Sequence, residues 1–110
     1  MRAVTSIFFY KDDIRFFGPG PYVLLRKIEE TGSIRTAAIN MDLSYAKALK
    51  MLKNAEESLG YSLVEKRIGG KGGGGSKLTD NAKEFLDKYK KYQEECREAN
   101  QRIYNDIFSE

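Results

Sequence analysis

The pattern of apolar and polar positions divides the chain into a short β-rich beginning and a series of helices. Residues 4–17 predict a β-hairpin, because β-branched and aromatic residues flank a polar turn at 11–13. Glycine and proline over 18–21 end the strand, and apolar residues at helical spacing predict a first helix over 22–31. The phenylalanines of the hairpin are expected to pack in the core.

Two helices joined by a short turn are predicted over residues 32–59. Ser33 and Ser44 suit the helix starts, because a serine hydroxyl accepts a backbone amide bond that otherwise lacks a partner. Asn40 and Asp42 tolerate the backbone conformations of a turn between them. This arrangement is typical of a helix-turn-helix whose second helix enters a DNA major groove, although two such helices also occur as a simple packed hairpin.

The second helix of this pair, over 44–59, is predicted to have two different faces. Apolar residues at steps of three and four form its core side: Ala46, Leu49, Leu52, Ala55 or Glu56, and Leu59. The opposite face is expected to approach base edges with Ser44, Tyr45, Lys47, Ala48 and Met51. Lys50 and Lys53 flank this face and can reach phosphates, although a solvated helix also displays lysines.

A glycine-rich loop between two short β segments predicts the wing of a winged helix. Strand character covers 62–68, the glycine-rich stretch covers 69–76, and Lys77-Leu78-Thr79 follows. Positive charge lines this segment at Lys66, Arg67, Lys71 and Lys77. A phosphate-binding P-loop is rejected, because its Gly-Lys-Ser/Thr order is replaced here by Gly-Ser-Lys. An engineered Gly-Gly-Gly-Gly-Ser spacer is the other interpretation of the loop.

No proline or glycine interrupts residues 79–108, which are predicted to form one long helix. Alternating steps of three and four separate its apolar residues, which begin at Ala82 and form a heptad pattern. Such a stripe is longer than a small core can cover, so we expect it to pair with another helix. The expected dimer contacts are Phe85, Tyr89, Tyr92, Cys96, Ala99 and Ile103. A solvated tail is the alternative.

Composition and charge limit the class of function. The chain has no histidine and one cysteine, so neither a metal site, a cofactor, an internal disulfide nor an enzyme is expected. No apolar run reaches the ~20 residues of a membrane helix, and no signal-peptide pattern is visible, so we expect a cytoplasmic location without membrane contact. The positive excess lies in residues 44–78, with seven Lys/Arg against three Asp/Glu, where the groove-reading surface is predicted.

A series of short motifs in fixed order resembles a known family. The motifs are Gly18-Pro19-Gly20, Gly32-Ser33-Ile34, Ala37-Ala38, Ser44-Tyr45, Leu63-Val64-Glu65, the run from Gly69 to Gly74, and Leu78-Thr79. Over most of residues 7–90 they resemble the N-terminal winged helix-turn-helix of the molybdate-responsive ModE-type transcription regulators, relatives of the LysR-type DNA-binding domain. That family carries the glycine run natively, which argues against an engineered spacer.

The resemblance implies a homodimer whose long helices pair antiparallel, with a recognition helix that starts at Ser44 and Tyr45 and a wing beside the DNA backbone. The sequence departs from the family at two positions, because an aromatic residue is common near Leu49 and an arginine is frequent where Pro21 stands. Molybdate binding is not expected, because the family binds it in a separate C-terminal domain and this chain ends at Glu110.

Together these observations predict an α+β fold, a winged helix-turn-helix with an N-terminal β-hairpin and a long C-terminal dimerisation helix. Residues 1–78 form the DNA-binding domain and 79–110 the dimerisation helix of the same unit. The expected function is a homodimeric, sequence-specific regulator of transcription that binds double-stranded DNA. Its candidate DNA-binding residues are Ser33, Arg35, Thr36, Ser44, Tyr45, Lys47, Ala48, Lys50, Met51, Lys66, Arg67, Lys71, Gly72 and Lys77. A protein-interaction module and an RNA-binding protein are the alternatives.

Overall fold

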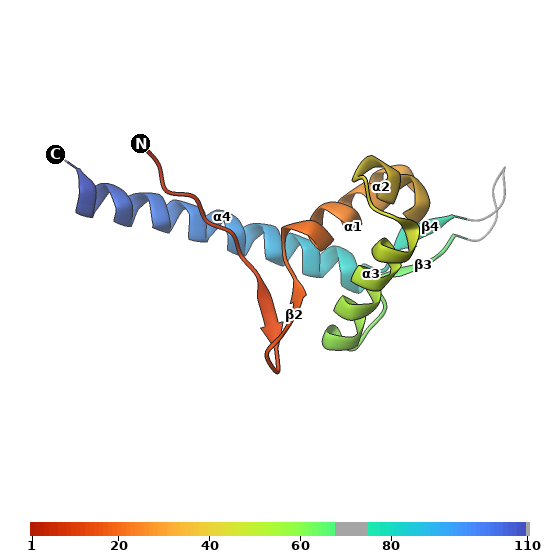
Figure 1. Cartoon of the computed structure of the whole chain (residues 1–110). Helices are drawn as coiled ribbons and strands as arrows, with labels where there is room; N and C mark the ends of the chain where they lie inside the picture. The colour runs from red at the N-terminus through yellow and green to blue at the C-terminus, as the bar shows by residue number, and fades with distance from the viewer. Residues whose placement is uncertain (68–74, 110) are drawn as a thin grey trace.

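The computed structural model describes residues 1–67 and 75–109 and has the predicted α+β fold (Figure 1). Two hairpins and four helices follow one another as β1 (Phe9–Lys11), β2 (Ile14–Phe17), α1 (Pro19–Thr31), α2 (Ile34–Asn40), α3 (Tyr45–Leu59), β3 (Val64–Lys66), β4 (Ser76–Leu78) and α4 (Asp80–Phe108). In each hairpin the two strands are antiparallel. The first three helices pack together beside the first half of α4, and the second half of α4 extends beyond them.

The N-terminal hairpin is shorter than predicted. Its turn residues, Asp12 and Asp13, have φ of 50° and 64°, a left-handed conformation that aspartate tolerates better than most side chains. The pairing stops where Phe9 meets Phe17, because Pro19 then begins α1 and no strand remains opposite the preceding residues. The prediction that residues 4–8 belong to the strand is therefore wrong.

The predicted helix starts are confirmed at the two serines that the sequence singled out. The hydroxyl groups of Ser33 and Ser44 accept backbone N–H bonds of 3.0 and 3.1 Å at the starts of α2 and α3. Gly32 and Gly60 end α1 and α3 with φ of 74° and 83°, a conformation that favours glycine. These caps determine the length and direction of the helix-turn-helix.

One hydrophobic core joins α1, α2, α3 and the first half of α4. Its fully buried members are Phe17, Leu24, Leu25, Ile28, Ala37, Ala38, Ala48, Leu52, Ala55, Leu63, Leu78, Ala82, Leu86 and Tyr89. The alanines belong to α2, α3 and α4, and a methyl side chain lets two helices approach closely. Of the helices described, none is long and apolar enough to cross a membrane.

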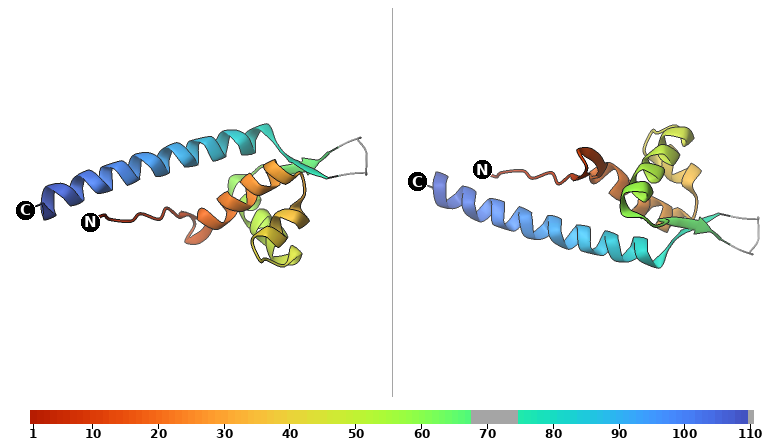
Figure 2. Two further views of the ribbon diagram at one scale, coloured as in Figure 1. Left: turned by 90° about the horizontal axis from the view of Figure 1, so that it is seen from above. Right: turned by 90° about the horizontal axis from the view of Figure 1, so that it is seen from below.

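Residues 1–8 form an extended arm that lies along α4, antiparallel to it, so that both termini are at the same end of the molecule (Figure 2). Tyr89 donates its hydroxyl proton to the carbonyl oxygen of Ile7 at 2.8 Å, and the Asn100 amide donates to the hydroxyl of Thr5. Alternate arm residues, such as Ile7, are half-buried while their neighbours are exposed. One side of α4 is therefore covered by the chain itself.

Tyr89 is the centre of this contact and is only 1% exposed. Its ring lies 4.9 Å from that of Phe17 and 5.3 Å from that of Phe9, both nearly edge to face. Burial raises the pKa of Tyr89, and the neighbouring Tyr22 adds to this effect. Because its side chain is enclosed within one chain, the prediction that Tyr89 contacts a second chain is wrong.

We predict that Tyr89→Phe removes the anchor of the arm without disturbing the aromatic packing. The free energy of unfolding should fall by about 0.5–1.5 kcal/mol, the usual net contribution of one such hydrogen bond. Urea denaturation measures this difference. Tyr45→Phe, at a side chain that is 39% exposed, is the matched control. Equal losses in the two variants would contradict the proposed anchor.

Candidate nucleic-acid interface

The exposed side of α3 is the centre of the candidate interface. Ala48, Leu52 and Ala55 turn inward and are at most 3% exposed. Five of the exposed residues in the first three turns form one surface, which we name the outward stripe: Tyr45, Ala46, Leu49, Lys50 and Lys53. In a helix-turn-helix, the N-terminal residues of the second helix contact base edges, so this stripe is the candidate DNA-reading surface of α3.

The predicted assignment of the two faces of α3 is wrong in part. Ala48 was expected on the DNA face but is fully buried, whereas Ala46 and Leu49 were expected in the core but are exposed. Both sets of positions have helical spacing, so periodicity alone does not separate them. Packing against α1 and α2 decides which set is buried, because these two helices meet α3 at the small side chain of Ala48.

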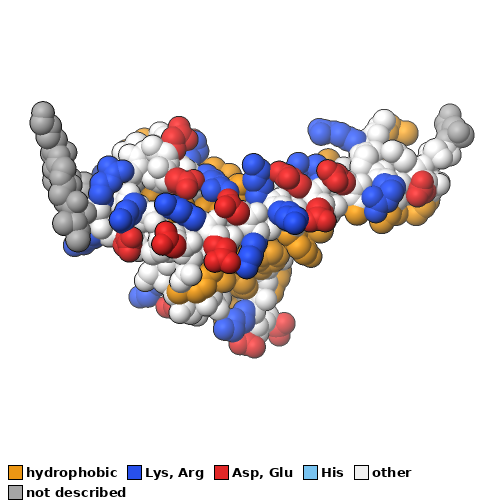
Figure 3. Space-filling view, turned by 180° about the vertical axis from the view of Figure 1, so that it is seen from behind, with side chains coloured by type: hydrophobic (Ala, Val, Ile, Leu, Met, Phe, Trp, Pro, Cys, Tyr) orange, Lys and Arg blue, Asp and Glu red, His pale blue; other side chains and the backbone are white. Residues whose placement is uncertain are grey.

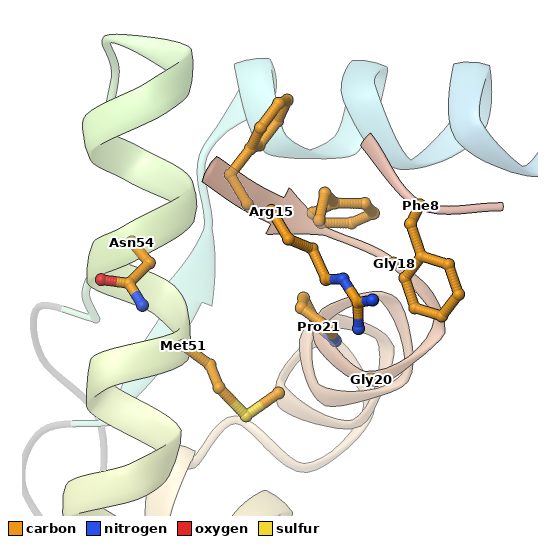
Figure 4. Close-up of a pocket in the computed structure, with 9 residues that line it drawn as sticks. Phe8, Arg15, Gly18, Gly20, Pro21, Met51 and Asn54 are labelled. Atoms are coloured by element: carbon orange, nitrogen blue, oxygen red, sulfur yellow. The ribbon is translucent and has the colours of Figure 1, made fainter. Parts of the chain in front are cut away.

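Met51 also lies away from the outward stripe. It is half-buried and packs against the core. Figure 4 shows its side chain directed from α3 toward the start of α1, where a Cβ added at Gly20 would lie 3.4 Å from the terminal methyl carbon. Together with Phe8 of the N-terminal arm and Arg15 of β2, these residues line a hollow of about 300 Å³. The prediction that Met51 contacts DNA is therefore not supported by its position.

Beside the outward stripe, α2 and the wing provide positive charge. The Arg35 guanidinium lies over the Tyr45 ring, 4.4 Å from its centroid. A hollow of about 320 Å³ joins these two residues to Ser33, Lys66 and Ser76. The structure thus brings together five residues from α2, α3 and both wing strands, four of which were predicted as DNA contacts. Of the described residues that line this hollow, two are cationic and none is acidic.

The base of the wing is attached to the turn between α1 and α2. The Ser76 N–H donates to the carbonyl oxygen of Gly32 at 2.8 Å. The guanidinium group of Arg67 lies so near Gly32 that a Cβ there would approach it to 2.8 Å. Lys77 forms an ion pair of 3.6 Å with Glu65 across the strands, so part of its charge is neutralised. Arg67 therefore lies against the turn between α1 and α2, and Lys77 lies opposite Glu65 on the neighbouring strand.

The remaining predicted DNA contacts occupy the edges of this surface. Ser44 and Thr36 are exposed, and Ser44 caps α3. Lys47 is exposed on α3, between Ala46 and Lys50 of the outward stripe and the half-buried Met51. Lys71 and Gly72 lie outside the described residues. DNA contact by each of these residues stays a prediction.

The predicted dimer residues divide between the core and the surface of α4. Phe85 is half-buried, with its ring edge-on to Phe17 at 4.7 Å, whereas Tyr92 and Ile103 are 53% and 52% exposed. Cys96 and Ala99 are half-buried between them, beside a hollow of about 450 Å³. Figure 3 shows charged side chains of both signs along α4 and hydrophobic ones gathered along one edge.

A helix-turn-helix followed by a β-hairpin defines the winged helix-turn-helix class of DNA-binding domains. The family model described as bacterial regulatory helix-turn-helix protein, lysR family, matches residues 22–83, more than half of the chain. The chain therefore belongs to the LysR family of bacterial regulatory helix-turn-helix proteins. Members of this class regulate transcription and are not enzymes.

Curated relatives resemble the chain over this same region. The molybdenum transport protein ModE of Herbaspirillum seropedicae is 41% identical over 81 residues, which are 74% of this chain and 28% of that protein. The transcriptional regulator ModE of Haemophilus influenzae is 38% identical over 67% of this chain and 29% of that protein. The ModE regulator of Yersinia pestis is 35% identical over 67% and 28%. The chain thus matches less than a third of the length of each relative, and the predicted resemblance to ModE-type regulators is confirmed.

We predict that the same substitution changes the stability of the protein strongly at one alanine of α3 and only slightly at another. Ala48→Leu inserts volume into a site that is 0% exposed, which should lower the free energy of unfolding by about 1–3 kcal/mol. Ala46→Leu adds the same atoms to the exposed stripe and should change stability by less than about 0.5 kcal/mol. Chemical denaturation of both variants makes the comparison. A greater loss in Ala46→Leu would reverse the assignment of the faces.

Proposed function

We propose that this protein binds specific sequences of double-stranded DNA as a homodimer and thereby regulates transcription. The observation that carries the proposal is the shared surface of α3, α2 and the wing, where Arg35 and Lys66 lie beside an exposed stripe at the start of α3. The transcriptional regulators among its relatives have the same domain at 35–38% identity, which supports this function.

The two parts of this surface serve different purposes. Lys50 and Lys53 lie on the outward stripe, where a helix in the major groove meets base edges first and phosphates at its margins. Lys66 lies on the wing strand β3, beside the hollow that Arg35 also lines. A lysine on such a margin neutralises phosphate charge and releases a counterion without reading sequence.

Substituting these lysines separates the two roles. Lys50→Ala should weaken binding to the preferred sequence by an amount on the order of 1–3 kcal/mol and binding to random DNA much less, because base contact is lost. Lys66→Ala should weaken both alike and lower the salt dependence by about one counterion. Lys90→Ala, on the exposed side of α4, is the control that should change neither. Fluorescence anisotropy over a range of salt concentrations measures all three.

The same titration tests the competing functions. The preferred sequence comes from selection of bound fragments out of random duplex DNA. Tight binding of duplex RNA in place of DNA would support an RNA-binding protein. Failure of the unmodified protein to retain any duplex would support a protein-interaction module and overturn the proposal.

The homodimer is proposed to form on the distal half of α4. The arm covers one flank of this segment through the contact of Thr5 with Asn100, and leaves the apolar line from Tyr92 to Ile103 exposed or half-exposed. The spacing along this line is symmetrical, because steps of four, three and four residues separate Tyr92, Cys96, Ala99 and Ile103. If two copies pair antiparallel, Tyr92 packs against Ile103 of the other copy and Cys96 against its Ala99.

Charge favours the antiparallel orientation. Glu95 and Arg102 flank the apolar line on the side away from the arm, and both line the hollow there. In an antiparallel pair, residues on the same flank face each other, so the Glu95 of each copy meets the Arg102 of the other, which gives two such pairs across the interface. A parallel pair would place Glu95 against Asn100, which is uncharged.

Disulfide trapping tests both the dimer and its orientation. A Cys96→Ser/Ala99→Cys variant, mixed with the unmodified protein and oxidised, should form a heterodimeric disulfide, because positions 96 and 99 face each other in the antiparallel pair. Adding Tyr92→Glu to both chains should abolish trapping and yield monomers by light scattering, whereas Lys90→Glu in both should not. Efficient disulfide formation by the unmodified protein alone would indicate a parallel pair, and a monomeric unmodified protein would exclude this dimer.

A further inference from the structure

The outward stripe of α3 is apolar in its first half and basic in its second half. Tyr45 and Leu49 are each 39% exposed and lie one turn apart, with the exposed Ala46 beside them. Lys50 and Lys53 continue the stripe toward the C-terminal end of α3. An exposed leucine is common by itself, whereas apolar side chains gathered at the start of a DNA-reading helix are suited to contact an apolar group of the ligand.

The Tyr45 ring is already engaged by its own chain. The guanidinium of Arg35 covers it at 4.4 Å, and both residues line the basic hollow next to the wing. This contact holds the ring at the margin of the stripe, near the positive charge that attracts phosphates. Leu49, with Ala46 three residues before it, is then the other exposed apolar part of the stripe.

We propose that Leu49, assisted by Ala46, reads thymine through its C5-methyl group. This inference rests on the proposed DNA-binding function and names the base that the apolar half of α3 recognises. In the major groove the thymine methyl is the apolar group among the edges of the four standard bases, and small or aliphatic side chains contact it. Lys53, further along the same stripe, places positive charge toward the phosphates and orients the helix.

Deoxyuridine provides a direct probe, because it lacks the thymine methyl and keeps the same hydrogen-bonding groups. The preferred duplex is first obtained by selection from random DNA, and each thymine is then replaced singly by deoxyuridine. At one or two positions the unmodified protein should bind about threefold to fivefold more weakly, the effect expected for burying one methyl group. Leu49→Ala should bind the thymine duplex more weakly and lose this sensitivity at the same positions.

Two further variants keep the result interpretable. Leu49→Gln retains the length of the side chain with a polar end, and it should also lose the sensitivity to deoxyuridine. Lys53→Ala should bind every duplex more weakly and retain the sensitivity in full. Thermal unfolding of each variant establishes that it is folded.

The possible failures are distinct. If the unmodified protein binds its preferred duplex but no deoxyuridine weakens it, the inference on thymine is wrong while DNA binding stands. If Leu49→Ala remains as sensitive as the unmodified protein, another residue reads the methyl group and the assignment to Leu49 is wrong. If the unmodified protein binds no duplex DNA, the proposed function itself fails, and this inference fails with it.

Discussion

Close contact between α3 and the two helices before it governs the rest of the DNA-binding domain. The contact is possible because α2 and α3 present alanines where they meet the core, including Ala38, Ala48 and Ala55, which are at most 1% exposed. A methyl group permits helices to approach where a longer side chain would hold them apart. Once Ala48 is buried, the rotation of α3 is determined, and Leu49 and Lys50 must turn outward.

The position of the wing depends on the same arrangement. Gly32 ends α1 and lies before the cap of α2, and its carbonyl oxygen accepts the N–H of Ser76 from the wing. The turn between α1 and α2 therefore also holds the wing in place. The wing in turn carries positive charge to the side of α3. Lys66 and Arg35 reach one hollow because the wing and α2 share this attachment.

Aromatic packing between the hairpin and α4 has a comparable effect on the other side of the molecule. The rings of Phe9, Phe17 and Tyr89 lie within 6.4 Å of one another, and the Tyr89 hydroxyl holds the arm at Ile7. The arm then covers one flank of α4 that would otherwise face solvent. The heptad pattern of α4 consequently serves two purposes, since its first half completes the core of one chain and its second half remains accessible.

The sequence by itself determined the features that depend on short-range contacts. The serine caps and the uninterrupted length of α4 were predicted correctly, because each follows from residues within one or two turns. The tertiary structure decided which of two equally spaced apolar sets on α3 is buried, and which half of α4 is covered. Those choices rest on contacts such as that of Ile7 with Tyr89, whose partners are 82 residues apart in the chain, and local periodicity carries no information about them.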